Sequence, residues 1–320
     1  MTLLMSDPVP SQTFDHIPVM CEEVVSALSF SGPALVVDGT LGLGGHSEAL
    51  LKHYPQMTVV GVEWDARALA VARERLASWG PRFRGIEGSY AKLPSLLSEL
   101  GSLSVNGILL DLGLSSRQLN DPLRGFSFLR HGSLDMRMSD TVRRTAWDIL
   151  QSTSDEELAD IFRTYGEERH AYRIAQALKK ALILGQLSND AWIVADCIRR
   201  AAGYIPGRLD PATRCFQALR IAVNGELDNV DHFLKSLPTL LASGGRAVIL
   251  SYHSLEDRRV KTAFHKAAKG CECPPQSPQC VCGKKPWARL PHRGALQPSE
   301  SEVAANSRSR SAKFRVLEKL

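Results

Sequence analysis

A glycine-rich turn follows the first apolar run of this sequence, in the stretch VVDGTLGLGGHSEALL at residues 36–51. The dinucleotide fingerprint GxGxxG requires a third glycine at the position that Ser47 occupies here. With the acid Asp38 at the end of the apolar run, the turn is closer to the acid-x-G-x-G-x-G turn of enzymes that bind S-adenosylmethionine. Glycines allow the backbone to approach the methionine and ribose parts of that cofactor. The turn therefore favours S-adenosylmethionine over a dinucleotide.

A second acid lies 19 residues after Gly44, where Glu63 ends the apolar run VVGVE. A carboxylate at this position can accept hydrogen bonds from both hydroxyls of a ribose. The alternative is a tight structural turn followed by a surface glutamate. A turn and a spaced acid in a strand-turn-helix context indicate a nucleoside site more strongly than either does alone.

A third acid, Asp111, ends the apolar run ILLD and precedes a loop of small polar residues. Ligands bind at strand ends in doubly wound sheets. In methyltransferases that act on amines, this place faces the target nitrogen. An exocyclic base amine such as N4 of cytosine is a poor nucleophile because its lone pair is delocalised into the ring, so such an enzyme must hold the amine with hydrogen-bond acceptors. Asp111 is our first candidate for this task, and a helix or turn cap is the alternative.

These acids must be positioned by the elements around them. Six apolar runs have the length and composition of buried strands: 34–39, 58–65, 83–89, 105–113, 244–254 and 311–320. Helical patterns separate the early runs, and this alternation predicts a parallel sheet with right-handed crossovers. A single long amphipathic helix is expected over residues 215–241, and the non-periodic segment 114–140 is expected to be a functional loop.

Residues 141–205 have only helical patterns, so the sequence predicts an α/β fold interrupted by an all-helical domain. We expect a flexible tail at 1–15, a discontinuous sheet domain at 16–140 and 206–320, and a helical substrate-recognition insertion at 141–205. Apolar residues make up 44% of the chain and no apolar run is long enough to span a membrane, which favours a cytoplasmic globular protein.

Four of the seven cysteines form the run CECPPQSPQCVC, at Cys271, Cys273, Cys280 and Cys282. Four thiolates within 12 residues can close a tetrahedral zinc site, although the one-residue spacing in each pair is tighter than usual. The alternative is a free or redox-responsive thiol cluster. Because no coordination position would stay open, such a metal would be structural.

Basic residues are concentrated near the end of the chain. Residues 281–320 hold nine Lys and Arg against three Asp and Glu, while the rest of the chain is nearly neutral. Trp287, Arg308 and Arg310 belong to this segment and suit phosphate contacts and base stacking. The segment indicates a polyanion such as RNA, and a solvated basic tail is the alternative.

Several runs together resemble the bacterial ribosomal RNA small subunit methyltransferase H family. The runs are HIPVM (16–20), DGTLGLGGHS (38–47), ILLDLGLSSRQL (108–119), RGFSF with LDMRM (124–138), RCFQALRIAVNGEL (214–227), SYHSLEDRRVK (251–261) and RSRSAKFRVLE (308–318). The resemblance implies a Rossmann-like class I S-adenosylmethionine methyltransferase sheet. The implied reaction is methylation of N4 of a cytidine in the decoding region of 16S rRNA, at cytosine 1402, with the small ribosomal subunit as partner.

The resemblance also implies site residues. The cofactor contacts fall on Gly44, Gly45, His46, Glu63, Tyr90, Asp111 and Gln118. Besides Asp111, His253 is a second candidate for catalysis, although a histidine in such a turn is more often structural. RNA contacts are expected at Arg124, Arg137, Trp287, Arg308 and Arg310, although Arg137 can instead pair with Asp135.

Three other functions remain open from sequence. The first is a transferase for DNA amines or a small molecule, although DLGLSS lacks the x-P-P-Y run usual in DNA amino-methyltransferases. The second is a non-enzymatic RNA-binding module with a zinc loop. Stoichiometric cofactor binding by the wild type that is lost in Gly44→Val or Asp111→Ala would count against this function. The third is a dehydrogenase, which Ser47 disfavours.

Overall fold

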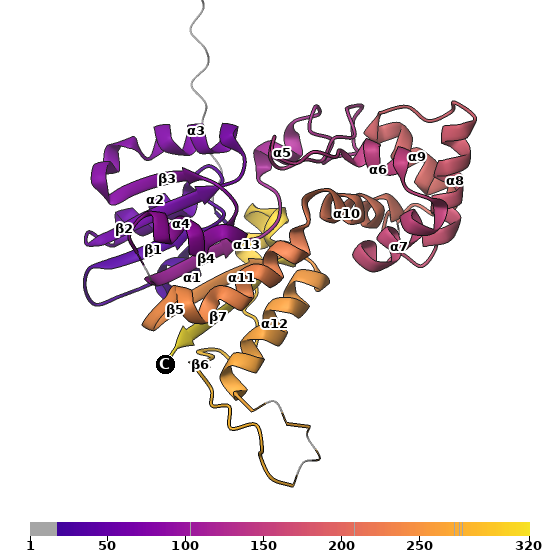
Figure 1. Cartoon of the computed structure of the whole chain (residues 1–320). Helices are drawn as coiled ribbons and strands as arrows, with labels where there is room; N and C mark the ends of the chain where they lie inside the picture. Colours follow the sequence, from indigo (N-terminus) through magenta and orange to yellow (C-terminus); the bar gives the residue numbers. More distant parts are fainter. Residues whose placement is uncertain (1–17, 103, 208, 272, 275, 277) are drawn as a thin grey trace, which may run out of the picture.

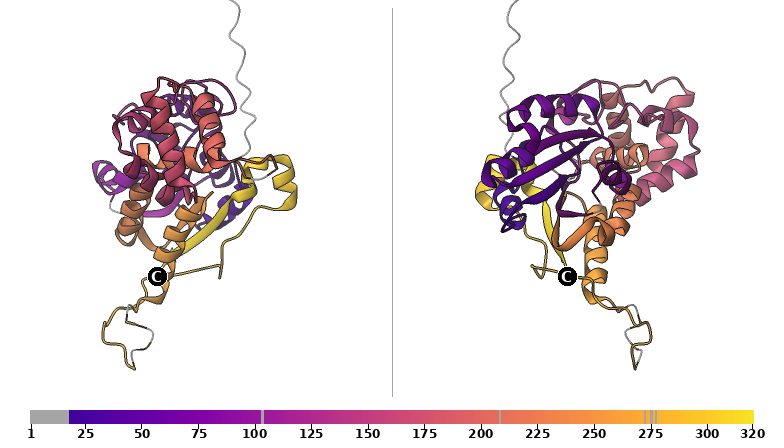
Figure 2. Two further views of the ribbon diagram at one scale, coloured as in Figure 1. Left: turned by 90° about the vertical axis from the view of Figure 1, so that its right-hand side faces the viewer. Right: turned by 60° about the vertical axis from the view of Figure 1, so that its left-hand side comes forward.

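The computed structural model of the chain describes residues 18–320 except residues 103, 208, 272, 275 and 277. One lobe contains a twisted sheet between helices, a second lobe is helical, and an arm extends from the first (Figure 1). The views in Figure 2 agree that the arm projects away from both lobes. The expected tail at 1–15 and the first two residues of the run HIPVM lie outside the described residues.

The sheet of the described residues has the strand order β3-β2-β1-β4-β5-β7-β6. Its strands are β1 (Ala34–Asp38), β2 (Met57–Glu63), β3 (Phe83–Glu87), β4 (Val105–Asp111), β5 (Leu241–Ser251), β6 (Ala288–Arg289) and β7 (Lys313–Lys319). Strands β1 to β5 pair in parallel, whereas β7 is antiparallel to β5 and β6. The six predicted strands are present, and the Rossmann-like sheet is confirmed. The strand order reverses between β1 and β4, where doubly wound sheets bind ligands.

Helices cover both faces of the sheet. One face packs against α1 (Cys21–Ala27), α2 (Gly45–His53) and α3 (Ala66–Arg75), and the other against α4 (Leu93–Glu99), α11 (Glu226–Leu240) and α12 (Ser254–Lys269). Because successive strand residues point to opposite faces, Val36 and Val59 join one hydrophobic cluster while Val37 and Val60 join the other. Burial on both faces explains the near-continuous apolar strand sequences.

The helical lobe has its own hydrophobic core. Its helices are α6 (Ala146–Ser152), α7 (Asp155–Gly166), α8 (Ala171–Ile183), α9 (Ala191–Ala202) and α10 (Pro211–Asn224). The core also includes Leu134 and Met136 from the segment before α6, and Phe216 from α10. The packing unit is therefore wider than residues 141–205.

The expectation of one helix over 215–241 is wrong. Gly225 has φ of 58° and separates α10 from α11. Glycine adopts this left-handed conformation without the steric cost of a Cβ atom. The break lets α10 pack in the helical lobe while α11 covers the sheet.

Shorter elements complete the chain. They are α5 (Ser116–Asn120), α13 (Glu300–Ala305) and the 3-10 turns η1 (Ala77–Arg82), η2 (Tyr90–Lys92) and η3 (Ser307–Ser311). The arm, residues 270–287, joins α12 to β6. Among the described residues, no helix is both long and apolar enough to cross a membrane.

Gly125 lies against the backbone of residues 133–135 within the 114–140 segment, and substitution of this glycine tests that contact. Its φ is 69°, and an added Cβ would lie 2.0 Å from the carbonyl oxygen of Ser133. Gly125→Ala should lower the free energy of unfolding by about 2–4 kcal/mol through strain and overpacking. Gly101→Ala is the matched control, because Gly101 has φ of 73° but open space around it, and should cost about 1 kcal/mol. Equal urea-unfolding midpoints for the two variants would contradict this packing.

Candidate cofactor and substrate site

A cavity of about 510 Å³ opens at the carboxyl ends of β1, β2 and β4. Six of the seven predicted cofactor residues line it, namely Gly45, His46, Glu63, Tyr90, Asp111 and Gln118. The seventh, Gly44, lies in the same turn with φ of 83°, and a Cβ there would lie 2.9 Å from the side chain of Leu76. The fold thus brings the predicted set to one place, at the strand-order reversal.

The glycine turn is held by Asp38, which is buried at the end of β1. Its carboxylate accepts hydrogen bonds from the Ser47 hydroxyl at 2.7 Å and from the Thr40 N–H at 3.3 Å. Burial raises the pKa of Asp38 because it disfavours the charged carboxylate. The two hydrogen bonds favour the charged form and offset part of this cost. The serine that replaces the third glycine of a dinucleotide fingerprint therefore has a structural role.

Glu63 connects β2 to the same turn. Its carboxylate accepts from the Gly42 N–H at 2.7 Å and from the Asp65 N–H at 2.8 Å. Burial raises its pKa to about 7. Glu63 is therefore not a solvated surface residue but a carboxylate oriented by the backbone at the cavity wall.

Asp111 lies at the centre of a polar group that joins β1, β4 and β5. Its Oδ1 accepts from the Tyr252 hydroxyl at 2.6 Å, and its backbone N–H donates to the Thr40 hydroxyl at 2.6 Å. Its Oδ2 lies 3.8 Å from Nδ1 of His46. Since Nε2 of His46 lies 2.9 Å from the carbonyl oxygen of Val19, that nitrogen donates and carries a proton. Asp111 is thus a fixed acceptor facing the cavity.

Tyr90 and Gln118 border the cavity from two other segments. The Tyr90 ring packs edge-to-face with Phe233 of α11, at 6.1 Å between centroids. Gln118 is buried, and its side-chain oxygen accepts from the Ser115 N–H as part of the capping box of α5. The Tyr90–Phe233 contact has no local sequence signal, whereas the spacing of Ser115 and Gln118 matches a capping box and could have indicated the start of α5 but not a place at the cavity.

A buried ion pair on the cavity wall was missed by sequence reasoning. Arg220 of α10 binds Glu226 of α11 through two hydrogen bonds of 2.8 and 2.9 Å. Both residues line the cavity. A signal existed, because the helical period places Arg220 on the same face as the buried residues Phe216 and Val223.

His253 has a capping role at the start of α12. Its Nδ1 accepts from the Glu256 N–H at 3.4 Å, and its Nε2 lies 3.2 Å from a carboxylate oxygen of Glu256. His253 is not among the described residues that line the cavity. This geometry favours the structural alternative for His253 and leaves Asp111 as the first candidate for catalysis.

The predicted RNA contacts fall into two groups. Arg124 forms an ion pair with Asp65 at 2.9 Å, and Arg137 binds Asp135 through two hydrogen bonds of 2.8 Å. Arg124 also donates to the carbonyl oxygens of residues 137 and 138. These two arginines hold the 114–140 segment together.

The second group lies at the surface. Arg308 borders the cavity and donates to Asn120 at 3.2 Å, and Arg310 is exposed on the same 3-10 turn. Trp287 is half-buried at the base of the arm, and the four cysteines of the arm lie together. Of the five predicted RNA contacts, Arg308 lines the cavity, and Arg310 lies in the chain between the lining residues Arg308 and Ser311.

The raised pKa of Glu63 predicts a pH dependence of S-adenosylmethionine binding. The Glu63 pKa of about 7 lies above its ordinary value of 4.5, so the cofactor-free protein holds a proton there below pH 7. Ribose hydroxyls donate to the ionised carboxylate, so affinity should rise about tenfold from pH 6 to pH 8. Titration calorimetry of wild type and Glu63→Gln separates this effect from the cofactor's own titration, and an equal pH slope in the two proteins would contradict it.

Comparison with known proteins places the chain in a family. It matches the MraW methylase family over residues 13–320. It is 47% identical over 311 residues to "Ribosomal RNA small subunit methyltransferase H" of Geobacter sulfurreducens, with 96% of this chain and 100% of the relative covered. It is 48% identical over 307 residues to the protein of that name from Myxococcus xanthus, with 96% and 98% covered.

Among solved structures, a putative rRNA methylase from Clostridium thermocellum matches with a TM-score of 0.43 and 10% identity, over 94% of this chain and 95% of that one. Family membership is shown by the sequence matches, which extend over nearly the whole chain, and not by this structural match. The chain belongs to the MraW methylase family.

Proposed function

We propose that this chain transfers a methyl group from S-adenosylmethionine to N4 of cytosine 1402 in 16S rRNA, within the small ribosomal subunit in the cytoplasm. The observation that carries the proposal is that the Asp111 carboxylate faces the same cavity as Glu63 and the glycine turn. The names of full-length relatives support rRNA of the small subunit as the substrate. The target atom follows from the resemblance of the motifs.

The cavity residues fit the cofactor. A carboxylate offers about four lone-pair sites, and backbone N–H groups use two of those on Glu63, so acceptors remain for two ribose hydroxyls. Gly42 and Gly44 adopt positive φ angles, which favour glycine, and without side chains they leave the backbone of the turn open to the cofactor. The Tyr90 ring supplies an apolar wall suited to adenine. When bound, S-adenosylmethionine supplies an electrophilic methyl group on a sulfonium sulfur.

Asp111 then orients the target amine. Its carboxylate has acceptor capacity beyond the hydrogen bond from Tyr252, so it can accept an N–H of the cytosine amine. Burial, together with the Asp111 charge, raises the pKa of Tyr252, which keeps its hydroxyl a donor at neutral pH. Held in this way, the carboxylate would stabilise the positive charge that develops on N4 as its lone pair attacks the methyl group. The carbon–sulfur bond would break as the N4–methyl bond forms, S-adenosylhomocysteine would leave, and N4 would lose its surplus proton to solvent. The chain's contribution is positioning and electrostatics.

The RNA must present an unstacked base, because a cytosine inside a helix cannot reach the cavity. Leu114, Leu119 and Met138, from the segment next to the helical lobe, border the cavity and are suited to contact such a base. Arg308 and Arg310 would bind phosphates at the rim, which fixes register without reading sequence. We propose the helical lobe, including residues 141–205, as the rRNA recognition unit, and Arg124 and Arg137 as residues that shape its connection to the sheet.

Methylation of small subunits from cells that lack this enzyme tests the proposal. Labelled S-adenosylmethionine and nucleoside mass spectrometry of the digested rRNA should detect N4-methylcytidine with wild type. Asp111→Ala should lower the rate at least about 100-fold, because it removes the acceptor for the amine. Glu99→Ala removes an exposed carboxylate of α4 and should retain full activity. Label in another nucleoside, or none in rRNA despite cofactor binding, would overturn the assignment.

Arg310→Ala tests the proposed phosphate contact. Loss of one cation at the rim should raise KM for small subunits about 3–10-fold and reduce the salt dependence of binding, with the cofactor Kd unchanged. Steady-state kinetics at two salt concentrations measure both effects. If KM and its salt dependence match those of wild type, Arg310 does not contact RNA.

A further inference from the structure

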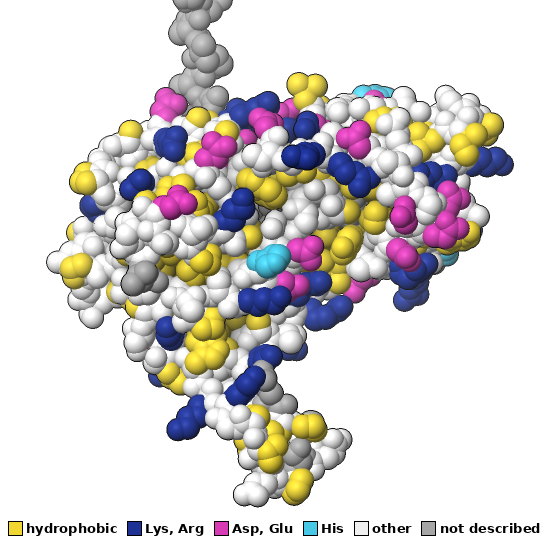
Figure 3. All heavy atoms as spheres, in the orientation of Figure 1, with side chains coloured by type: hydrophobic (Ala, Val, Ile, Leu, Met, Phe, Trp, Pro, Cys, Tyr) yellow, Lys and Arg dark blue, Asp and Glu magenta, His cyan; other side chains and the backbone are white. Residues whose placement is uncertain are grey.

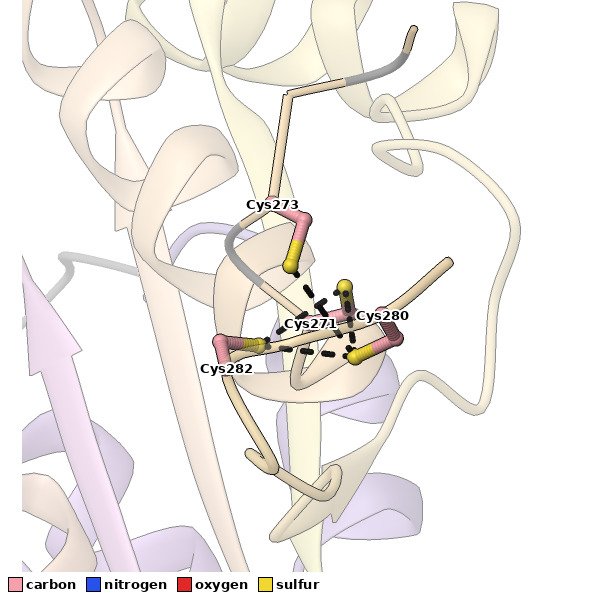
Figure 4. Close-up of side chains that lie close together, drawn as sticks. All are labelled: Cys271, Cys273, Cys280 and Cys282. Atoms are coloured by element: carbon pink, nitrogen blue, oxygen red, sulfur yellow. Dashed lines mark hydrogen bonds between the residues drawn. The ribbon is translucent and has the colours of Figure 1, made fainter. Parts of the chain in front are cut away.

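The arm brings its four cysteines into one cluster. Figure 4 shows the side chains of Cys271, Cys273, Cys280 and Cys282 directed toward a common centre. The sulfur of Cys280 lies 3.5, 4.0 and 3.7 Å from those of Cys271, Cys273 and Cys282, and the sulfurs of Cys271 and Cys282 are 3.8 Å apart. All four sulfurs lie within 4.8 Å of one another.

These separations match the geometry of one tetrahedral metal ion. Four sulfurs at about 2.3 Å from a zinc ion are about 3.8 Å from one another. An iron–sulfur cluster places several iron and sulfide atoms between its cysteines and needs a wider spacing. A disulfide requires two sulfurs about 2.05 Å apart, which is much closer than the separations of 3.5 to 4.0 Å found here. The cluster therefore has the dimensions of a single-ion site.

The structure of the arm also favours a bound ion. Among its described residues, none from 271 to 286 is buried, so the arm has no hydrophobic core of its own. Short segments without a core usually need a cross-link or a metal to hold one conformation. The backbone N–H of Val281 points to the sulfur of Cys273 at 3.4 Å, a contact that stabilises a thiolate. A metal explains why four thiols, none of them buried in a core, share one centre.

From this geometry we infer that Cys271, Cys273, Cys280 and Cys282 bind one structural Zn²⁺ ion. Four thiolates fill the tetrahedral coordination and leave no position for a substrate. Binding releases thiol protons to the solvent, since zinc binds the thiolate form. This inference stands apart from the proposed methyl transfer, because no residue of the cluster lines the cavity.

The ion would also fix a basic surface at the base of the arm. A groove of about 770 Å³ next to the cluster is lined by Arg258, Arg259, Lys266, Lys284, Lys285 and Trp287, among others. In the space-filling view, Lys and Arg side chains gather over α11, α12 and the base of the arm (Figure 3). Because Lys284 and Lys285 closely follow Cys282 in the chain, a zinc ion at the cluster would hold them beside α12.

The metal content of the full-length chain tests the inference. The protein is purified without a polyhistidine tag or chelator, under reducing conditions, and assayed by plasma mass spectrometry. We expect one zinc ion per chain in wild type, and in the controls Cys21→Ser and Cys197→Ser, which alter cysteines outside the cluster. Cys273→Ser and Cys280→Ser should lose most of the zinc. Wild-type zinc content in these two variants would overturn the site.

Cobalt substitution gives a readout that does not depend on how the variants fold. Co²⁺ added to reduced, metal-free wild type should produce the visible absorption of tetrahedral cobalt with thiolate charge-transfer bands, and equimolar Zn²⁺ should abolish it. Zinc should also protect the arm from trypsin, while the cofactor affinity stays constant. Absence of zinc from the isolated protein together with no cobalt spectrum would refute the inference.

Discussion

The site depends on three acids that hydrogen bonds hold at one edge of a parallel sheet, of which Asp38 is buried and Glu63 and Asp111 are half-buried. Asp38, Glu63 and Asp111 end three neighbouring strands. Asp38 accepts a hydrogen bond from the Ser47 hydroxyl, Glu63 accepts one from the Gly42 N–H, and Asp111 accepts one from the Tyr252 hydroxyl. An unsatisfied buried carboxylate costs several kcal/mol, on the order of the whole stability of a domain. The glycine turn therefore supports the strand ends as well as forming part of the proposed cofactor site.

This constraint explains what sequence could and could not predict. The turn, Glu63 and Asp111 were predictable, because strand ends and glycine spacing are local signals. The bond between Tyr252 and Asp111 was not, because it joins residues 141 positions apart. The strands were predictable from their apolar runs, but the break at Gly225 was not, since an isolated glycine inside an apolar period is compatible with a continuous helix.

For other residues of the site, the sequence did not show the interactions that fix their positions. The helical period places Arg220 on a buried face, but it does not show that Glu226 of the next helix is its partner. Gln118 is polar and lies in a polar segment, yet its capping hydrogen bond keeps it buried at the cavity. Arg124 and Arg137 were expected to contact RNA. Arg137 pairs with Asp135, which is the alternative that the sequence offered, and Arg124 pairs with Asp65. The distant partner of Arg124 is set by tertiary packing, which sequence spacing does not determine.

The proposed methyl transfer requires one arrangement, in which the cofactor ribose binds Glu63 while the target amine faces Asp111. The most direct test is a crystal structure with S-adenosylhomocysteine and a cytidine-containing oligonucleotide. We expect both ribose hydroxyls within hydrogen-bond distance of the Glu63 carboxylate and N4 of the cytosine within that distance of Asp111. A cofactor bound away from the glycine turn, or an N4 directed away from Asp111, would contradict the account.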